Sequence, residues 1–138
     1  MLWPFDERRE DFEPTLWLPR PGLDLQQVWF AGSHSDIGGG YEPDDRGLNG
    51  ADYPLAWMLK EAEACGLGVE SHLLEALKPD VSAKLHNSRR HVFRFARPLI
   101  RLLQVPDIET RLHESVGERW RRDPDYRPPN LKTVGFEG

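Results

Sequence analysis

The sequence predicts an α/β protein organised around one buried strand. Val28–Phe30 is a short β-branched and aromatic run between polar residues, which is typical of a strand buried in a sheet. A titratable histidine, His34, and three consecutive glycines follow it. Apolar residues at helical spacing then predict a long helix over residues 53–65. Strand, glycine-rich connection and helix is the order found where α/β enzymes carry catalytic groups, beyond the carboxyl ends of strands.

Length and composition exclude several classes of protein. The 138 residues allow one domain with a modest core, because only 38% of them are apolar and 30% are charged. The net charge of −5 argues against a general nucleic-acid binder. No apolar run approaches the roughly 20 residues of a membrane-spanning helix, and the apolar residues 1–5 are too short for a signal peptide. The single cysteine, Cys65, excludes an internal disulfide.

Taken in order, the first part of the chain is charged and contains few regular elements. Residues 6–17 predict a solvated turn of helix followed by an extended strip, and a loop with Pro19, Pro21 and Gly22 leads to the strand. Val28–Phe30 is the one strand that the sequence predicts clearly. Residues 42–51 are polar, with a proline and two glycines, and predict a surface loop.

The helix predicted over residues 53–65 has signals at both ends. Asp52 is the expected N-cap, Pro54 falls in the first turn where a missing N–H is tolerated, and Gly66 occupies the C′ position. Cys65 is expected to be a buried structural thiol at the end of the apolar face. The residues predicted to be buried on this helix, packed near a core with Trp29 and Phe30, are Leu55, Met58, Leu59 and Ala62.

Weaker signals follow. A shorter helix is predicted over residues 71–77, where a proline stops it. The apolar cluster within residues 92–103 does not distinguish strand from helix. Ser115 and Glu118 have the capping-box form and predict the start of a last helix. Residues 126–131 contain two prolines and are predicted to be extended.

Residues 29–41 also carry a family pattern, since they read WFAGSHSDIGGGY. This closely resembles the WFxGxHxDxGGGY signature of an uncharacterised α/β-hydrolase domain family that includes the catalytic domains of some type VI secretion phospholipase effectors. The resemblance begins at DERR, residues 6–9, after unrelated residues 1–5. It continues through segments 57–58, 86–88, 113–116 and 126–131. It implies that residues 1–138 form the C-terminal portion of one incomplete α/β-hydrolase domain, with its last strand, a histidine loop and several helices, mostly helix and loop if taken alone.

His34 is the candidate catalytic residue. An imidazole near neutral pH can take the proton from a serine hydroxyl and return it to the leaving group. From the residues alone, a loop histidine bonded to backbone is the better interpretation. The resemblance favours catalysis, because the histidine of an α/β-hydrolase triad lies in the loop after the last strand. We therefore expect His34 in a loop beyond the end of Val28–Phe30.

Asp36 and the glycines are expected to support the site. His34 and Asp36 could supply two metal ligands, but no third and fourth ligand follow at fitting spacing, so neither a metal nor a cofactor is expected. The simpler account is that the Asp36 carboxylate accepts from N–H groups of the glycine loop. Gly38, Gly39 and Gly40 lack phosphate-loop and Rossmann spacing and are expected to turn the chain sharply beside the active site. The resemblance implies that the triad acid is an upstream aspartate absent from this chain.

The remaining titratable side chains give weaker signals. Scattered histidines among polar residues are expected to be surface or structural, and the arginine pairs are expected to be solvated. These residues are His72, His86, His91, His113, Arg89, Arg90, Arg121 and Arg122.

The nucleophile is missing, because no Gly-x-Ser-x-Gly occurs in the sequence. We therefore expect a fragment of a serine-dependent ester hydrolase that supplies His34 and is inactive without its N-terminal part. The resemblance implies an ester or lipid substrate and a secreted effector, whereas the absence of a targeting signal favours the cytoplasm by default. The expected partner is the missing part of the domain or a second copy of the chain. The rival interpretation is an inactive relic or a stand-alone interaction module.

Overall fold

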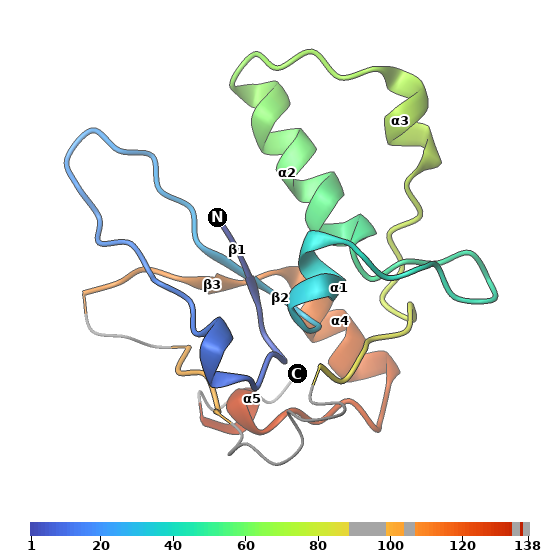
Figure 1. The fold of residues 1–138 in the computed structure, drawn as a ribbon. Helices are drawn as coiled ribbons and strands as arrows, with labels where there is room; N and C mark the ends of the chain where they lie inside the picture. The colour runs from blue at the N-terminus through green and yellow to red at the C-terminus, as the bar shows by residue number, and fades with distance from the viewer. Residues whose placement is uncertain (89–98, 104–106, 134–135, 137–138) are drawn as a thin grey trace.

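The computed structural model describes residues 1–88, 99–103, 107–133 and 136. It shows a small α/β protein with a parallel three-stranded sheet in the order β1-β2-β3 (Figure 1). The strands are β1 (Leu2–Pro4), β2 (Val28–Phe30) and β3 (Arg111–Leu112). The helices are a 3-10 turn (Glu10–Phe12), α1 (His34–Gly38), α2 (Asp52–Ala64), α3 (Ser71–Ala76), α4 (Glu114–Arg122) and α5 (Pro129–Thr133).

The central strand is the one that the sequence predicts. All three residues of β2 are buried, and β2 pairs with β1 on one side and with β3 on the other. The prediction of a single clear strand is incomplete, because residues 1–5, expected to be unrelated to the family pattern, contribute β1. Trp3 pairs with Trp29 across the two strands. An apolar three-residue strand is too short for periodicity to reveal it.

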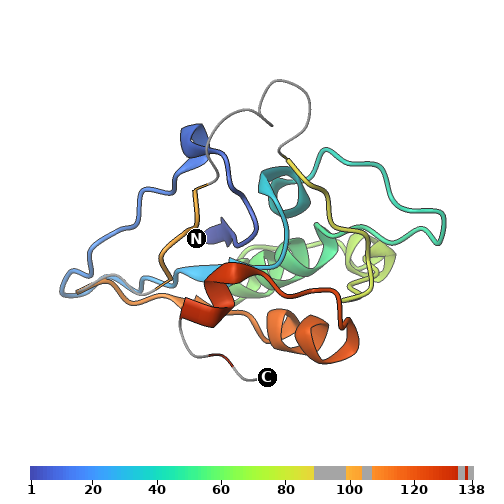
Figure 2. The ribbon, with the colours of Figure 1, turned by 90° about the horizontal axis from the view of Figure 1, so that it is seen from below.

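The core lies on the sheet and is closed by the C-terminal half of the chain. Phe5, Trp29, Leu103, Val116 and Leu131 form one buried cluster. In Figure 2, α1 and the 3-10 turn lie above the strands, whereas α4 lies below them. The predicted burial of Trp29 and Phe30 is confirmed, since each is 1% exposed.

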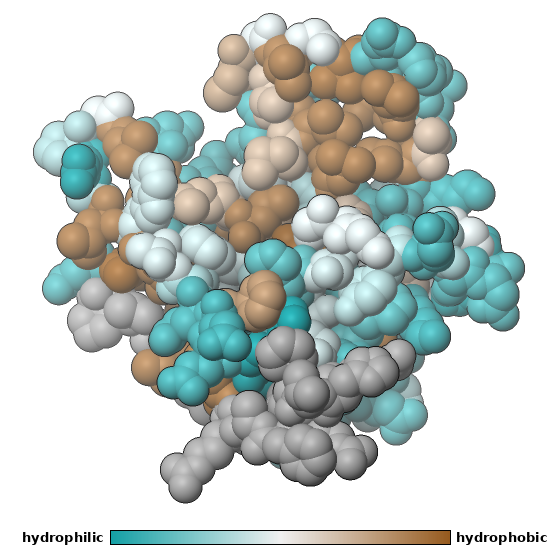
Figure 3. All heavy atoms as spheres, viewed as in Figure 1, coloured by the Kyte–Doolittle hydropathy of each residue, from teal (hydrophilic) through white to brown (hydrophobic). Residues whose placement is uncertain are grey.

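Two of the four residues predicted to be buried on the long helix are exposed, so this prediction is wrong for them. Leu55 is 45% exposed and Met58 is 40% exposed, whereas Leu59 and Ala62 are half-buried. The helix packs on the sheet through the Trp57 ring, which meets the Phe30 ring edge-on. Leu55 and Met58 remain largely exposed, and Figure 3 shows apolar side chains gathered over α2 and α3.

The sequence predicts a capping residue at each end of this helix, and one of the two is confirmed. Gly66 has φ of +93° just after the helix, as a C′ glycine should. The N-cap is Ala51 rather than Asp52, whose carboxylate accepts from the Lys78 N–H instead. Cys65 is exposed, so the prediction of a buried thiol is wrong. The end of the helix is exposed to solvent, because residues 63–66 are all exposed.

The later elements differ from prediction mainly at their first residues. The helix predicted over residues 71–77 is confirmed as α3, whereas α4 begins before Ser115 and is capped by His113, whose ring accepts from the Ser115 N–H. Residues 126–131 are not wholly extended, because α5 begins at Pro129. Proline is tolerated at a first helical position, where its N–H would have no partner. Most of the cluster at 92–103 lies outside the described residues.

Candidate functional site

His34 lies beyond the carboxyl end of the central strand β2, but it does not lie in a loop. It is the first residue of α1, a five-residue helix whose N-cap is Ser33. The Asp36 carboxylate accepts from the Ser33 N–H at 2.8 Å and from the Ser33 Oγ at 2.7 Å. A serine followed three residues later by an acidic residue is a form of capping box that starts a helix. The three following glycines masked this signal and led to the incorrect prediction of a loop.

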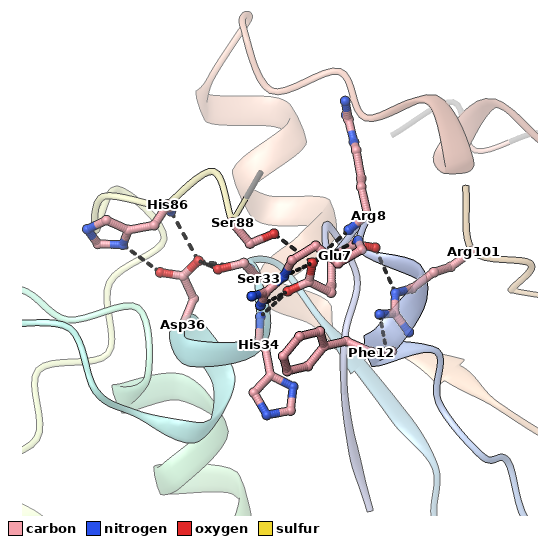
Figure 4. A network of polar contacts seen from close by, with 10 residues as sticks. Glu7, Arg8, Phe12, Ser33, His34, Asp36, His86, Ser88 and Arg101 are labelled. Atoms are coloured by element: carbon pink, nitrogen blue, oxygen red, sulfur yellow. Dashed lines mark hydrogen bonds and ion pairs between the residues drawn. The ribbon is translucent and has the colours of Figure 1, made fainter. Parts of the chain in front are cut away.

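The His34 imidazole is exposed, and no hydrogen bond joins it to any residue that the structure describes. It points away from the polar network behind it and lies beside the Phe12 ring, with the ring centroids 4.9 Å apart (Figure 4). The ring also borders an apolar groove of about 600 Å³ along β1. Residues lining this groove include Leu2, Trp3, Phe12, Trp17, Ile37 and Met58. The imidazole is therefore open to a ligand or a second polypeptide.

Asp36 is buried, with 1% of its surface exposed, and its partners come from two parts of the chain. Besides Ser33, its Oδ2 accepts from the His86 N–H at 3.0 Å, and its Oδ1 pairs with His86 Nδ1 at 2.7 Å. The prediction that Asp36 caps N–H groups of the glycine loop is wrong, because the donors belong to residues 33 and 86. The prediction of a surface or structural role for His86 missed this pair, which joins positions 50 residues apart.

Glu7 is a second buried carboxylate at the site, although sequence reasoning placed it in a solvated segment. Its Oε2 accepts from the His34 N–H at 3.2 Å, and its Oε1 accepts from the Ser88 Oγ at 2.6 Å. Arg9 forms an ion pair with the same carboxylate. Burial alone would raise the pKa of Glu7, but the hydrogen bonds from Arg9, Ser88 and the His34 backbone lower it to about 2. Glu7 is therefore a charged acceptor that holds the backbone of His34.

The pKa of Asp6, one residue earlier, is shifted in the opposite direction to that of Glu7. Its Oδ2 accepts from the Gly32 N–H at 2.8 Å and from the Tyr126 hydroxyl at 2.9 Å. Desolvation raises its pKa to about 6 although both hydrogen bonds lower it. Asp6 borders an open cavity of about 300 Å³ on the side of His86 and Tyr126. The Asp6 carboxylate therefore anchors the chain around Gly32, whereas the His34 ring has no acidic partner among the described residues.

Only part of the triple glycine has unusual backbone. Gly39 and Gly40 have φ of +83° and +112°, which supports the predicted sharp turn, but Gly38 ends α1 in an ordinary conformation. The more constrained glycine is Gly32, which sequence reasoning overlooked. Its φ is +119°, and a Cβ there would lie 2.5 Å from the Cβ of Asp36. Gly32 thus allows the Asp36 side chain to reach back to its own helix N-terminus.

The other candidate residues remain apart from this site. His72 is exposed and pairs with Glu70, while His113 stacks on the Phe30 ring as a structural residue. His91, Arg89 and Arg90 lie outside the described residues. Within the described ranges, no group of three or more His, Cys, Asp or Glu side chains is arranged to hold a metal ion. The same part of the chain contains no helix that is long and apolar enough to cross a membrane.

A comparison with known protein families found a match for the segment that contains His34 and its supporting residues Glu7 and Asp36. Residues 4–61 match the family described as "T6SS, Phospholipase effector Tle1-like, catalytic domain". This segment is therefore phospholipase effector-like. The match includes β2, α1 and most of α2, and it confirms the resemblance predicted from WFAGSHSDIGGGY. No curated protein and no solved structure matches the chain.

Proposed function

We propose that this chain supplies His34 as the general base of a serine-dependent ester hydrolase of the phospholipase effector kind. The observation that carries the proposal is the exposed imidazole of His34, which has no hydrogen-bond partner in the described structure and lies beyond the carboxyl end of the central parallel strand. In an α/β-hydrolase the triad histidine also follows the carboxyl end of a strand of the sheet. Here that strand is β2, which β3 follows later in the chain. The family match over residues 4–61 includes this position.

In the proposed reaction, His34 first accepts a proton and then donates it. The imidazole accepts the proton of a serine hydroxyl while the serine oxygen attacks the ester carbonyl carbon. The resulting imidazolium donates that proton to the departing alcohol oxygen, and water then repeats the sequence on the acyl-enzyme. Glu7 holds the His34 backbone while the ring remains open on its outer side. Gly39 and Gly40 turn the chain away from the ring without adding side chains.

The nucleophile, the oxyanion donors and the triad acid are proposed to come from a polypeptide segment outside these residues. The 138 residues contain no Gly-x-Ser-x-Gly, and the His34 ring has no acidic partner among the described residues. The apolar groove beside His34 runs along β1, one of the two edge strands of the described sheet. A completing segment placed there would extend the sheet toward an α/β-hydrolase fold, with an ester or lipid as substrate.

The test is complementation. Hydrolysis of short-chain esters and phospholipids is measured for this chain, for a family segment that carries Gly-x-Ser-x-Gly and the triad acid, and for the two together. We expect activity only in the mixture, and we expect His34→Ala to abolish it. His72→Ala is the matched control, because His72 is exposed and touches only Glu70. Activity of the lone chain that survives His34→Ala would refute both the role of His34 and the need for a second segment.

A second candidate function is an interaction module without catalysis, as expected of an inactive relic. The observation that favours it is the uncovered apolar side of α2, where Leu55 and Met58 are exposed. The same mixture distinguishes the two functions. Binding of the two segments without hydrolysis at any ratio would favour the module over the hydrolase.

A further inference from the structure

Two consecutive backbone N–H groups are held by two different buried carboxylates at the start of α1. Asp36 Oδ2 accepts from the N–H of Ser33, and Glu7 Oε2 accepts from the N–H of His34. Asp36 and Glu7 are each 1% exposed, so water does not compete for these contacts. The backbone position of His34 is therefore set from both sides (Figure 4).

Both carboxylates are also bound by one short segment from far along the chain, residues 86–88, here termed the 86–88 clamp. Its first residue, His86, donates its backbone N–H to Asp36 and pairs its Nδ1 with Asp36 Oδ1. Its last residue, Ser88, donates its hydroxyl to Glu7. The clamp thus bridges the two groups that hold residues 33 and 34.

The imidazole of His86 is fixed in orientation as well as in position. Its ring stacks on the Tyr41 ring, with centroids 3.7 Å apart, and Tyr41 directly follows the glycine turn after α1. The ring therefore lies between Asp36 on α1 and the segment that leaves α1. Without it, Asp36 Oδ1 would be buried with no donor, which is unfavourable enough to make the carboxylate shift away from Ser33.

We infer that His86 is a positioning residue, which sets the place of His34 through Asp36 and Ser33. The inference depends on the proposed function only in naming His34 as the base. The imidazole of His86 itself faces Asp36 and Tyr41, and no described contact joins it to the His34 ring. Its role is to keep the first turn of α1 in one arrangement.

The test measures backbone amide hydrogen exchange at Ser33 and His34, which needs no activity. His86→Ala is expected to speed exchange at these two amides about tenfold or more, with the amides of Trp29 and Val116 unchanged. His86→Asn keeps a donor at the position of Nδ1 and is expected to restore slow exchange. His86→Gln places its donor farther out and is expected to behave like His86→Ala.

Comparing the Asn and Gln variants keeps the test decisive if His86→Ala does not fold, because both substitutions are polar and similar in size. Unchanged exchange in His86→Gln, or equal acceleration at Trp29 and Val116, would overturn the inference. In the complemented hydrolase, kcat should fall in His86→Gln with KM unchanged and recover in His86→Asn. If the wild-type mixture has no activity, the proposed function fails, while the exchange rates still decide the role of His86.

Discussion

At the residue scale, two adjacent carboxylates experience opposite environments. Desolvation raises the pKa of Asp6 to about 6, whereas hydrogen bonds to Arg9 and Ser88 outweigh burial and lower the pKa of Glu7 to about 2. Near neutral pH, Glu7 is a firmly charged acceptor for the His34 N–H. Asp6 instead carries a charge that its surroundings disfavour. These shifts have opposite consequences for stability as pH changes.

The first prediction concerns the pH dependence of Asp6. Because its folded pKa of about 6 exceeds the ordinary value of 3.8, its contribution to stability is fully present below pH 3.8 and is lost as pH rises through 6. Glu7 contributes above pH 4.5 and loses its contribution only as pH falls toward 2. Urea unfolding should therefore show a smaller loss of stability between pH 4.5 and 7 in Asp6→Asn than in the wild type. An equal loss in both proteins would contradict the raised pKa.

The second prediction concerns Gly32. In Gly32→Ala the new Cβ would meet the Asp36 Cβ at 2.5 Å and the residue would have to hold φ of +119°. The expected destabilisation is at least about 2 kcal/mol in urea unfolding. Gly38→Ala is the matched control, since it lies in α1 with nothing within 4 Å of the new Cβ. It should be neutral or stabilising by about 0.5 kcal/mol. A similar loss of unfolding free energy in both variants would show that the close approach of Asp36 does not exclude a side chain at position 32.

At the scale of elements, β2 and α2 could be predicted from the sequence, whereas the start of α1 could not. The strand β2 was predicted because three large apolar residues stand together, and α2 was predicted because its apolar residues recur at helical spacing. The start of α1 was missed because the Ser33 and Asp36 pair has a capping form that the glycines obscured. The burial of α2 was predicted wrongly because periodicity reveals an apolar side but not what covers it.

The third prediction compares two apolar residues on different helices. Leu131 of α5 is 0% exposed, so Leu131→Ala should cost roughly 2–5 kcal/mol of unfolding free energy. Met58→Ala should cost less than about 1 kcal/mol, because its side chain is 40% exposed and little packing is lost. Chemical denaturation of both variants makes the comparison. Truncating a buried methionine to alanine typically costs about 2 kcal/mol or more of unfolding free energy. A loss of that size in Met58→Ala would mean that this side of α2 is covered.

At the scale of the whole molecule, the site combines residues that only the fold brings together. His34 was found from its place after a strand, within a family pattern. Its supporting residues were not found, because Ser88 and Glu7 are 81 residues apart and His86 and Asp36 are 50 apart. Such contacts leave no periodic signal in a single sequence. The short segment HNS, residues 86–88, was the one visible hint, through its similarity to a late family motif.

The proposed second segment would join the sheet at the edge that β1 forms. Met1 O accepts from the Val28 N–H and the Phe5 N–H donates to Phe30 O, so alternate residues of β1 bond to β2. The backbone groups of Leu2 therefore face the opposite edge, beside the apolar groove that ends at His34. A strand edge with which no described strand pairs, next to an open imidazole, is the arrangement that the proposed completion of the hydrolase requires.

The central claim is that His34 activates a serine supplied by a second segment. The most direct measurement is covalent labelling of that serine by a fluorophosphonate, which reports activation of the nucleophile whatever the substrate. We expect rapid labelling in the mixture of the two segments, equal labelling with His72→Ala, and loss of labelling with His34→Ala. Labelling of the segment at the same rate with His34→Ala, or labelling of a serine in this chain alone, would contradict it.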